Sequence, residues 1–300
     1  MDFLYNLITG IGLGSIYAII ALGYTMVYGI AKMLNFAHGD VIMVGGYTYF
    51  LAVSEFELGM NPVVGVLLAI VICTILGMTI ERVAYKPLRQ APSLAVLITA
   101  IGVSYLLQNG AQILWSTTPK TFDLLQIKVN GSASLTMFDG QLSVKWVSII
   151  TIVVCVIVMI ALTLFTGKTR TGKAMRACSE DKEAAQLMGI SVNKTISITF
   201  AIGSALAAIA GILYCIYSTK VMSTTGSIPG IKAFTAAVVG GIGSIPGALL
   251  GGILLGVIEI FARSSETFSV LADAIVFAVL IIVLLVKPTG LLGKQVREKV

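Results

Sequence analysis

Long apolar runs alternate with short polar segments along the whole chain. Apolar stretches lie near residues 4–29, 39–54, 62–81, 94–115, 146–166, 196–217 and 268–286, with a more irregular one at 229–262. Most are close to the ~20 residues that a helix needs to cross the hydrocarbon core of a bilayer. The pattern predicts an all-α polytopic membrane protein with about seven to nine transmembrane helices. We expect a single transmembrane domain over residues 1–300, because no long polar segment is left for a soluble one.

The polar break in the irregular stretch is Gly240-Gly-Ile-Gly-Ser-Ile-Pro-Gly247. Six spans bring the chain outside at about Thr219 and the last ends inside at Lys287, so residues 229–262 must cross an even number of times. Glycines and a proline interrupt helices, which predicts a re-entrant or hairpin segment. Backbone freed at membrane depth must be buried in protein or line a wet cavity. The residues of this break that we therefore place on a translocation pathway are Gly240, Gly243, Ser244 and Pro246.

Close helix packing is the alternative interpretation of these glycines. They recur at four-residue spacing, as small residues do where two membrane helices touch. The repeats are Gly243, Gly247 and Gly251 in one series, and Gly252 and Gly256 in another.

A second polar interruption is Asn35-Phe-Ala-His-Gly-Asp40, between the first two apolar spans. Ionisable groups that enter a span are costly unless paired or hydrated, so Asn35, His38 and Asp40 are further candidates for the pathway. The simpler interpretation, which the sequence favours, is that Asn35 or Asp40 caps the following helix. Glu259 and Asp273 lie near predicted span ends, where solvation at the interface is the ordinary explanation.

Residues 168–193 form a charge-rich loop that contains a predicted short helix. Ser179 can cap it, Glu180 and Asp181 suit the positive end of its dipole, and Gly189 can supply the left-handed residue that ends it after about nine residues.

One face of this predicted helix is apolar. Ala184, Leu187 and Met188 recur at i, i+3 and i+4, which places them together. The face fits a groove on a soluble partner, and the alternative is an ordinary solvated loop. A rigid helix here can pass a partner's movement to the span that begins near Ile196. The candidate coupling residues are Glu180, Glu183, Ala184, Leu187, Met188 and Gly189.

Composition and charge agree with a membrane protein. Hydrophobic residues make up 57% and charged residues 11%, with a mean hydropathy of +0.98, against about 25% charged in soluble domains. The net charge of +6 does not indicate nucleic acid, because the basic residues are distributed by loop. An external amino terminus and a cytoplasmic carboxyl terminus place most of them, including the loop 168–193, in the cytoplasm.

Catalytic chemistry has no counterpart in the sequence. The segment Gly167-Lys-Thr-Arg-Thr-Gly-Lys173 fits the first seven positions of a phosphate-binding loop. The next residue, Ala174, stands where the magnesium-binding Ser or Thr belongs, and the segment follows a membrane helix instead of a strand. The single histidine and the scattered cysteines have neither metal nor disulfide spacing. We therefore expect a chain that is not an enzyme and binds no cofactor or metal.

Several motifs resemble a known family of permeases. Glu183-Ala-Ala followed by Gly189 resembles the import signature of ATP-binding-cassette (ABC) permeases, although its Leu-Pro ending is absent. The motifs that resemble the branched-chain amino acid permease family, and its LivH-type member in particular, are Gly14-Ser-Ile-Tyr-Ala-Ile-Ile-Ala-Leu-Gly23, Asn35-Phe-Ala-His-Gly-Asp40, Arg82-Val-Ala-Tyr-Lys-Pro-Leu-Arg89 and Gly240-Gly-Ile-Gly-Ser-Ile-Pro-Gly247.

The resemblance implies a bacterial inner-membrane importer with four kinds of partner. These are a LivM-type permease, two cytoplasmic ATPases, a periplasmic binding protein, and leucine, isoleucine or valine as substrate. Relatives that carry urea or short amides leave the substrate open.

A stand-alone secondary transporter is the rival from a different class. In it the loop 168–193 only connects two spans, and His38 with Asp40 relays protons. Proton relays usually need several buried ionisable groups, and the predicted spans hold few. A structural scaffold is hard to reconcile with two broken segments.

Overall fold

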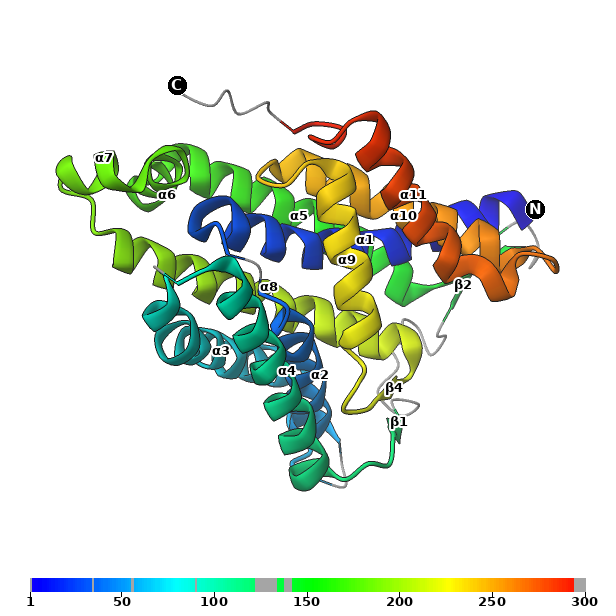
Figure 1. Ribbon diagram of the computed structural model, residues 1–300. Helices are drawn as coiled ribbons and strands as arrows, with labels where there is room; N and C mark the ends of the chain where they lie inside the picture. Colours follow the sequence, from blue (N-terminus) through cyan, green and yellow to red (C-terminus); the bar gives the residue numbers. More distant parts are fainter. Residues whose placement is uncertain are drawn as a thin grey trace.

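The computed structural model describes residues 2–33, 35–54, 57–89, 91–121, 134–137 and 142–293, and it is almost entirely helical (Figure 1). Seven helical stretches among these residues are long and apolar enough to cross a membrane, which confirms the predicted class. The helices are α1 (Asp2–Ala31), α2 (His38–Val53), α3 (Pro62–Ile80), α4 (Ser93–Trp115), α5 (Trp146–Lys168), α6 (Arg170–Glu180), α7 (Lys182–Leu187), α8 (Val192–Ser218), α9 (Ser227–Gly240), α10 (Ile245–Ser264) and α11 (Ala272–Val286).

Short elements join these helices. α3 continues into a π-helical turn, Glu81–Tyr85, and a 3-10 turn, Lys86–Leu88, and another 3-10 turn, Ser269–Leu271, precedes α11. Two short pairs of antiparallel strands lie in the segments between the helices. β1 (Lys120–Thr121) pairs with β4 (Lys220–Val221), and β2 (Ser134–Met137) pairs with β3 (Leu142–Lys145).

α1 is the central helix and is buried over most of its length, between α5, α8, α9 and α10 (Figure 1). Its tightest neighbour is α10, because glycines let the two backbones approach. A Cβ on Gly14 would lie 2.7 Å from the Cα of Ile253, and one on Gly252 would lie 2.5 Å from the backbone nitrogen of Ala18. A Cβ on Gly256 would overlap the backbone of Gly14. The packing interpretation is therefore confirmed for Gly252 and Gly256.

The break in residues 229–262 is a hairpin between two separate helices. α9 ends at Gly240, and Gly241 and Gly243 take positive φ values of 104° and 95°. Ser244 caps α10, because its Oγ accepts a hydrogen bond from the Gly247 N–H at 3.2 Å. The predicted hairpin is confirmed as a turn between two separate helices.

The hairpin is tied down on both sides. Gly247 packs on the backbone of Gly240, whereas Gly243 is exposed. The N–H groups of Leu291 and Leu292 donate to the carbonyls of Val239 and Gly240 at 2.8 and 2.9 Å. Two carbonyls at the end of α9 are thus hydrogen-bonded by the segment that follows α11.

α2 and α9 are short for membrane helices. With 16 and 14 residues they are about 24 and 21 Å long, less than the ~30 Å hydrocarbon core. They meet where Gly39 of α2 touches the backbone of Gly226 and Gly230. α2 begins at His38 without a side-chain cap. The capping interpretation of Asn35 and Asp40 is therefore wrong: the Asn35 side chain instead accepts a hydrogen bond from the Tyr85 hydroxyl at 2.9 Å.

Basic segments gather at one end of the bundle. The end of α1 lies beside the hairpin, with 3.5 Å between a Cβ built on Gly29 and the Cα of Gly243. At the same end, Arg89 bonds to Glu81 and to Asn193, which ties the π-helical turn to the start of α8. This grouping agrees with the loop assignment made from the charge pattern.

Candidate functional site

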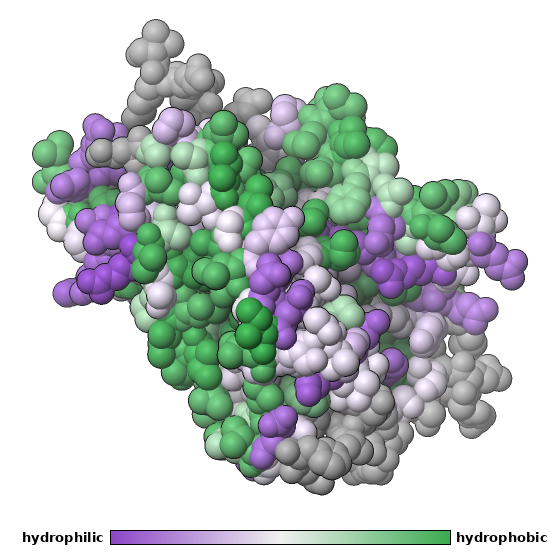
Figure 2. Space-filling model, turned by 60° about the horizontal axis from the view of Figure 1, so that its bottom comes forward, coloured by the Kyte–Doolittle hydropathy of each residue, from purple (hydrophilic) through white to green (hydrophobic). Residues whose placement is uncertain are grey.

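A cavity of about 360 Å³ lies between α2, α4 and α9, within the usual range for small-molecule sites. The space-filling view that brings the bottom of Figure 1 forward shows white and purple side chains beside green ones near the middle of the face (Figure 2). The polar lining comes from Asp40, Ser104, Gln108 and Ser227, and the apolar lining includes Phe36, Leu97, Ile101 and Ile231.

The polar lining is organised around the Gln108 side chain. Its Nε2 lies 2.9 Å from Asp40 Oδ1, 3.1 Å from Ser104 Oγ and 3.3 Å from Ser227 Oγ. An amide nitrogen has two hydrogens, so it satisfies two of these three oxygens at a time. The two serine hydroxyls can also donate, whereas the Asp40 carboxylate can only accept.

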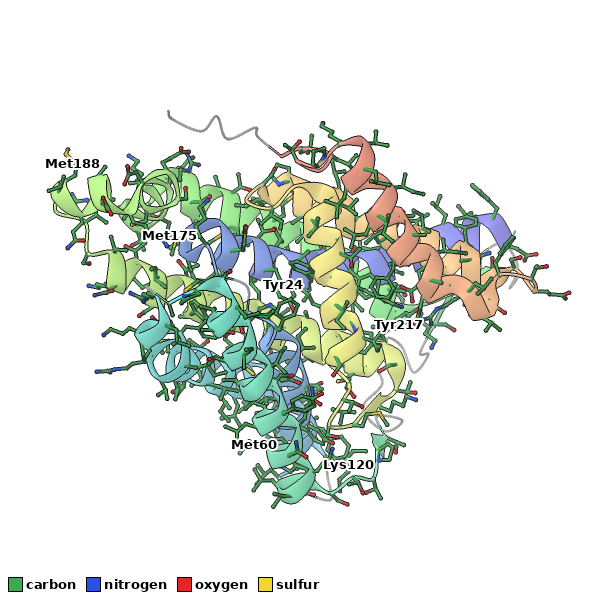
Figure 3. All side chains as sticks on the ribbon, in the orientation of Figure 1. Tyr24, Met60, Lys120, Met175, Met188 and Tyr217 are labelled. Carbon is green, nitrogen blue, oxygen red and sulfur yellow. The ribbon has the colours of Figure 1, made fainter. Side chains whose placement is uncertain are left out.

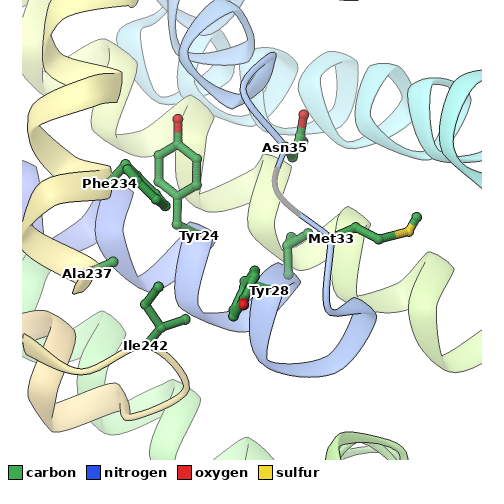
Figure 4. Close-up of a pocket in the computed structure, with 8 residues that line it drawn as sticks. Tyr24, Tyr28, Met33, Asn35, Phe234, Ala237 and Ile242 are labelled. Atoms are coloured by element: carbon green, nitrogen blue, oxygen red, sulfur yellow. The ribbon is translucent and has the colours of Figure 1, made fainter. Parts of the chain in front are cut away.

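A second, smaller cavity adjoins the end of α1 (Figure 4). Its free volume of about 10 Å³ has room for about one water molecule. Asn35 lines it, and so does Ile242 from the α9–α10 hairpin. Tyr24 lines both cavities.

Aromatic rings separate the two cavities. The Tyr24 and Phe234 ring centroids are 5.8 Å apart, and Phe234 lies at the same distance from Phe36. Figure 4 shows Tyr24 and Phe234 adjacent on the wall of the smaller cavity. The larger cavity is thus closed toward the smaller one by packed side chains.

His38 lies outside both linings. It is buried against α1, where its ring is 4.6 Å from that of Tyr24 and a Cβ on Gly23 would meet its Nε2. Residues two apart on a helix do not face each other. The arrangement that a proton relay between His38 and Asp40 requires is therefore absent.

The other predicted pathway residues take separate places. Asn35 and Asp40 line the smaller and the larger cavity. Gly240 ends α9 and Pro246 lies in the first turn of α10, while Gly243 and the capping Ser244 lie between the two helices.

A buried ionic cluster joins α1, α9, α10 and α11. Lys232 Nζ lies 2.8 Å from Glu259 Oε1 and 2.6 Å from Asp273 Oδ1. Arg263 reaches the same oxygen of Glu259 at 2.6 Å, and the Tyr17 hydroxyl donates to its other oxygen at 2.9 Å. Interfacial solvation is the wrong explanation for Glu259, because it is fully buried. Asp273 is half-exposed, but its carboxylate is also paired with Lys232.

The loop 168–193 contains two helices, α6 and α7. Asp181, not Ser179, caps α7: its carboxylate accepts from the N–H groups of Glu183 and Ala184 at 2.9 and 3.0 Å. Ser179 lies inside α6, so α7 has six residues instead of about nine. Gly189 takes the predicted left-handed conformation, with φ +83°.

The apolar side chains of α7 project outward. Leu187 is 89% exposed and Met188, the C-cap residue, is 83% exposed. Figure 3 shows Met188 at the tip of the molecule. Ala184 and Glu183 are exposed as well, and Glu180 ends α6.

The inner side of the loop is attached to the bundle. Ala185 is buried, and Lys182 Nζ donates to the carbonyl of Ala31 at 2.7 Å, at the end of α1. Burial lowers the pKa of Lys182, and nearby Arg89 and Lys32 lower it further. α7 thus contacts α1 directly and leads into α8 through Ile190.

Sequence reasoning missed the cavity residues of α4. A signal was present, because Ser104, Gln108 and Gln112 stand at i, i+4 and i+8 on an otherwise apolar helix and so share one face. Gln112 continues the polar line beyond the cavity, donating to Ser223 at 3.2 Å. Lys232 carried no such local signal.

Comparison with known proteins decides the family. The profile of the family described as "Branched-chain amino acid transport system / permease component" matches residues 6–284. The chain belongs to this family. As a branched-chain amino acid permease family member, it is a multi-pass inner-membrane protein and a transport component, not an enzyme.

Two curated relatives match over nearly the full length of the chain. The chain is 44% identical to the high-affinity branched-chain amino acid transport system permease protein BraD of Pseudomonas aeruginosa, over 99% of this chain and 98% of that protein. The LivH permease of Escherichia coli K12 is also 44% identical, with the same coverage. Among solved structures, PsaBC from Streptococcus pneumoniae in complex with Fab matches at a TM-score of 0.48 and 17% identity, over 96% of this chain and 93% of that one.

Proposed function

We propose that this chain is the permease subunit of an ABC importer for branched-chain amino acids, namely leucine, isoleucine and valine. The main support for coupling to partner ATPases is the exposed apolar pair Leu187 and Met188. They lie on a helix that is attached to both α1 and α8. Such a pair gains stability when a partner's groove covers it. Two partner ATPases hydrolyse ATP and move α7, and α7 moves the bundle.

The basic end of the bundle faces the cytoplasm, where the ATPases dock. The positive-inside rule supports this orientation, with the amino terminus on the periplasmic side. A periplasmic binding protein delivers the substrate to the opposite end. A second, LivM-type permease completes the pathway beside α4, whose outer face includes the exposed Leu106 and Ile113.

The substrate passes through the two cavities in turn. Asp40 marks the larger one and Asn35 the smaller one, and the rings of Tyr24, Phe36 and Phe234 close the way between them. The α9–α10 hairpin, Gly240–Pro246, acts on this path by holding Ile242 at the smaller cavity.

The test replaces Leu187 and Met188 together with Asp in the complete transporter. Burial of the two side chains is worth roughly 3–6 kcal/mol in all, so ATPase affinity should fall by about two to four powers of ten. The ATPases should no longer co-purify, while membrane insertion is unchanged because both side chains are exposed.

Gln186→Asp is the matched control. It adds a charge on the same exposed helix outside the apolar face and should leave co-purification and uptake intact. Normal co-purification and leucine uptake in the Leu187→Asp/Met188→Asp variant would refute the coupling role of α7.

A further inference from the structure

Two buried carboxylates of the bundle, Glu259 and Asp40, differ in whether a positive side chain is paired with them. Glu259 is paired with Lys232 and Arg263. Asp40 is only 2% exposed, yet it forms no ion pair with any residue that the structure describes. An ionised carboxylate in a membrane interior is costly without a countercharge. The chain supplies that charge for Glu259 and leaves Asp40 without it.

Asp40 also differs in where its side chain lies. It forms part of the wall of the 360 Å³ cavity, next to the hydroxyls of Ser104 and Ser227. The Gln108 amide donates to the Asp40 carboxylate at 2.9 Å, and a serine hydroxyl can donate as well, but these neutral donors bring no countercharge. An ammonium group brings the positive charge that this wall lacks, together with three donors for its oxygens.

The rest of the cavity suits an aliphatic group. Leu97, Ile101 and Ile231 line it from α4 and α9. A ligand with an ammonium group at one end and a branched aliphatic chain at the other thus finds a complementary surface at each end.

We propose that this cavity is a transient binding site for an aliphatic amino acid, in which Asp40 pairs with the substrate's α-ammonium group. The inference rests on the proposed function and deepens it. The site selects against neutral amides and urea, because these lack the cation that would offset the buried charge of Asp40.

The first test is Asp40→Asn in the complete transporter, reconstituted in vesicles with ATP and leucine-loaded binding protein. Losing one partner of a buried charge pair typically costs 2 kcal/mol or more, so leucine uptake should fall about 30-fold or further. ATP hydrolysis stimulated by the binding protein should persist, because α7 is untouched. Glu266→Gln neutralises an exposed carboxylate outside the cavity and should keep uptake within about threefold of the wild type.

The second test separates binding from a purely structural role. Ser104→Cys places a thiol in the cavity wall, and Thr118→Cys places one at an exposed position beyond α4. Leucine at ten times its apparent Kd should slow modification of the first thiol about tenfold and leave the second unchanged. The protection should disappear when Asp40→Asn is added.

The two levels of the proposal fail in different ways. If the wild type neither hydrolyses ATP with leucine-loaded binding protein nor takes up leucine, the proposed function is wrong. If the wild type works but Asp40→Asn transports leucine as well as Glu266→Gln does, or if leucine still protects the Ser104→Cys thiol when Asp40→Asn is present, the role of Asp40 is overturned.

Discussion

Replacing Lys232 with Met tests how much the buried ionic cluster contributes to stability. The side chain is 1% exposed and its ammonium group bridges Glu259 and Asp273 at 2.8 and 2.6 Å. The cluster carries two positive groups, Lys232 and Arg263, and two negative ones, Glu259 and Asp273, so its net charge is zero. Met has a similar length but no charge and no donor, and the cluster becomes negative.

The magnitude follows from what remains after the change. Breaking a buried pair costs about 3–5 kcal/mol when a charge is left uncompensated. Glu259 keeps Arg263 at 2.6 Å and the Tyr17 hydroxyl at 2.9 Å, and Asp273 is half-exposed, so water screens it. We therefore expect a loss near the lower end, about 3 kcal/mol.

Equilibrium unfolding in mixed micelles measures this loss. Lys220→Met is the control, because that lysine is exposed and should change the free energy of unfolding by less than about 0.5 kcal/mol. Combining Lys232→Met with Glu259→Gln removes both buried charges, so the double variant should be more stable than the sum of the single effects predicts. Additive losses, or a Lys232→Met variant as stable as the control, would show that the pair does not act as a buried ion pair.

Two further predictions concern α1. Gly256→Leu should lower the free energy of unfolding by about 3 kcal/mol, because a Cβ there overlaps the Gly14 backbone. The yield and the melting temperature should fall with it, and an unchanged melting temperature would contradict the close contact. His38→Gln should leave uptake driven by ATP and only moderately reduced, because His38 packs against α1 and lines neither cavity. Uptake by vesicles with and without a proton gradient checks this, and gradient-driven uptake that vanishes in the variant would favour the secondary transporter.

The helices could be predicted because each depends on a local pattern. Apolar runs located the spans, and the glycines with Pro246 located the hairpin. The cap of α7 could not be assigned in the same way, since Ser179 and Asp181 are both good caps. The choice depends on how far α6 continues, and its buried Met175 and Cys178 hold it on the bundle as far as Glu180.

The polar contacts inside the bundle depend on long-range packing. Asp40 and Gln108 are 68 residues apart, and Lys232 and Asp273 are 41 apart. No spacing rule within one helix relates such pairs. Asp40 could be selected as an ionisable group entering a span, but its neighbours appear only once α2, α4 and α9 are placed together.

The burial of α1 has a consequence for biogenesis. α1 is synthesised early, but the helices that cover it, α8 and α10, begin only at Val192 and Ile245. Until they arrive, the glycine surface of α1 must face lipid or the insertion machinery. The native bundle is then completed by contacts between residues far apart in the sequence, and such contacts form slowly. A ribosome-bound chain that stops before Ile245 should therefore hold α1 in the membrane without its final neighbours, exposed to proteases and chaperones that survey unassembled helices.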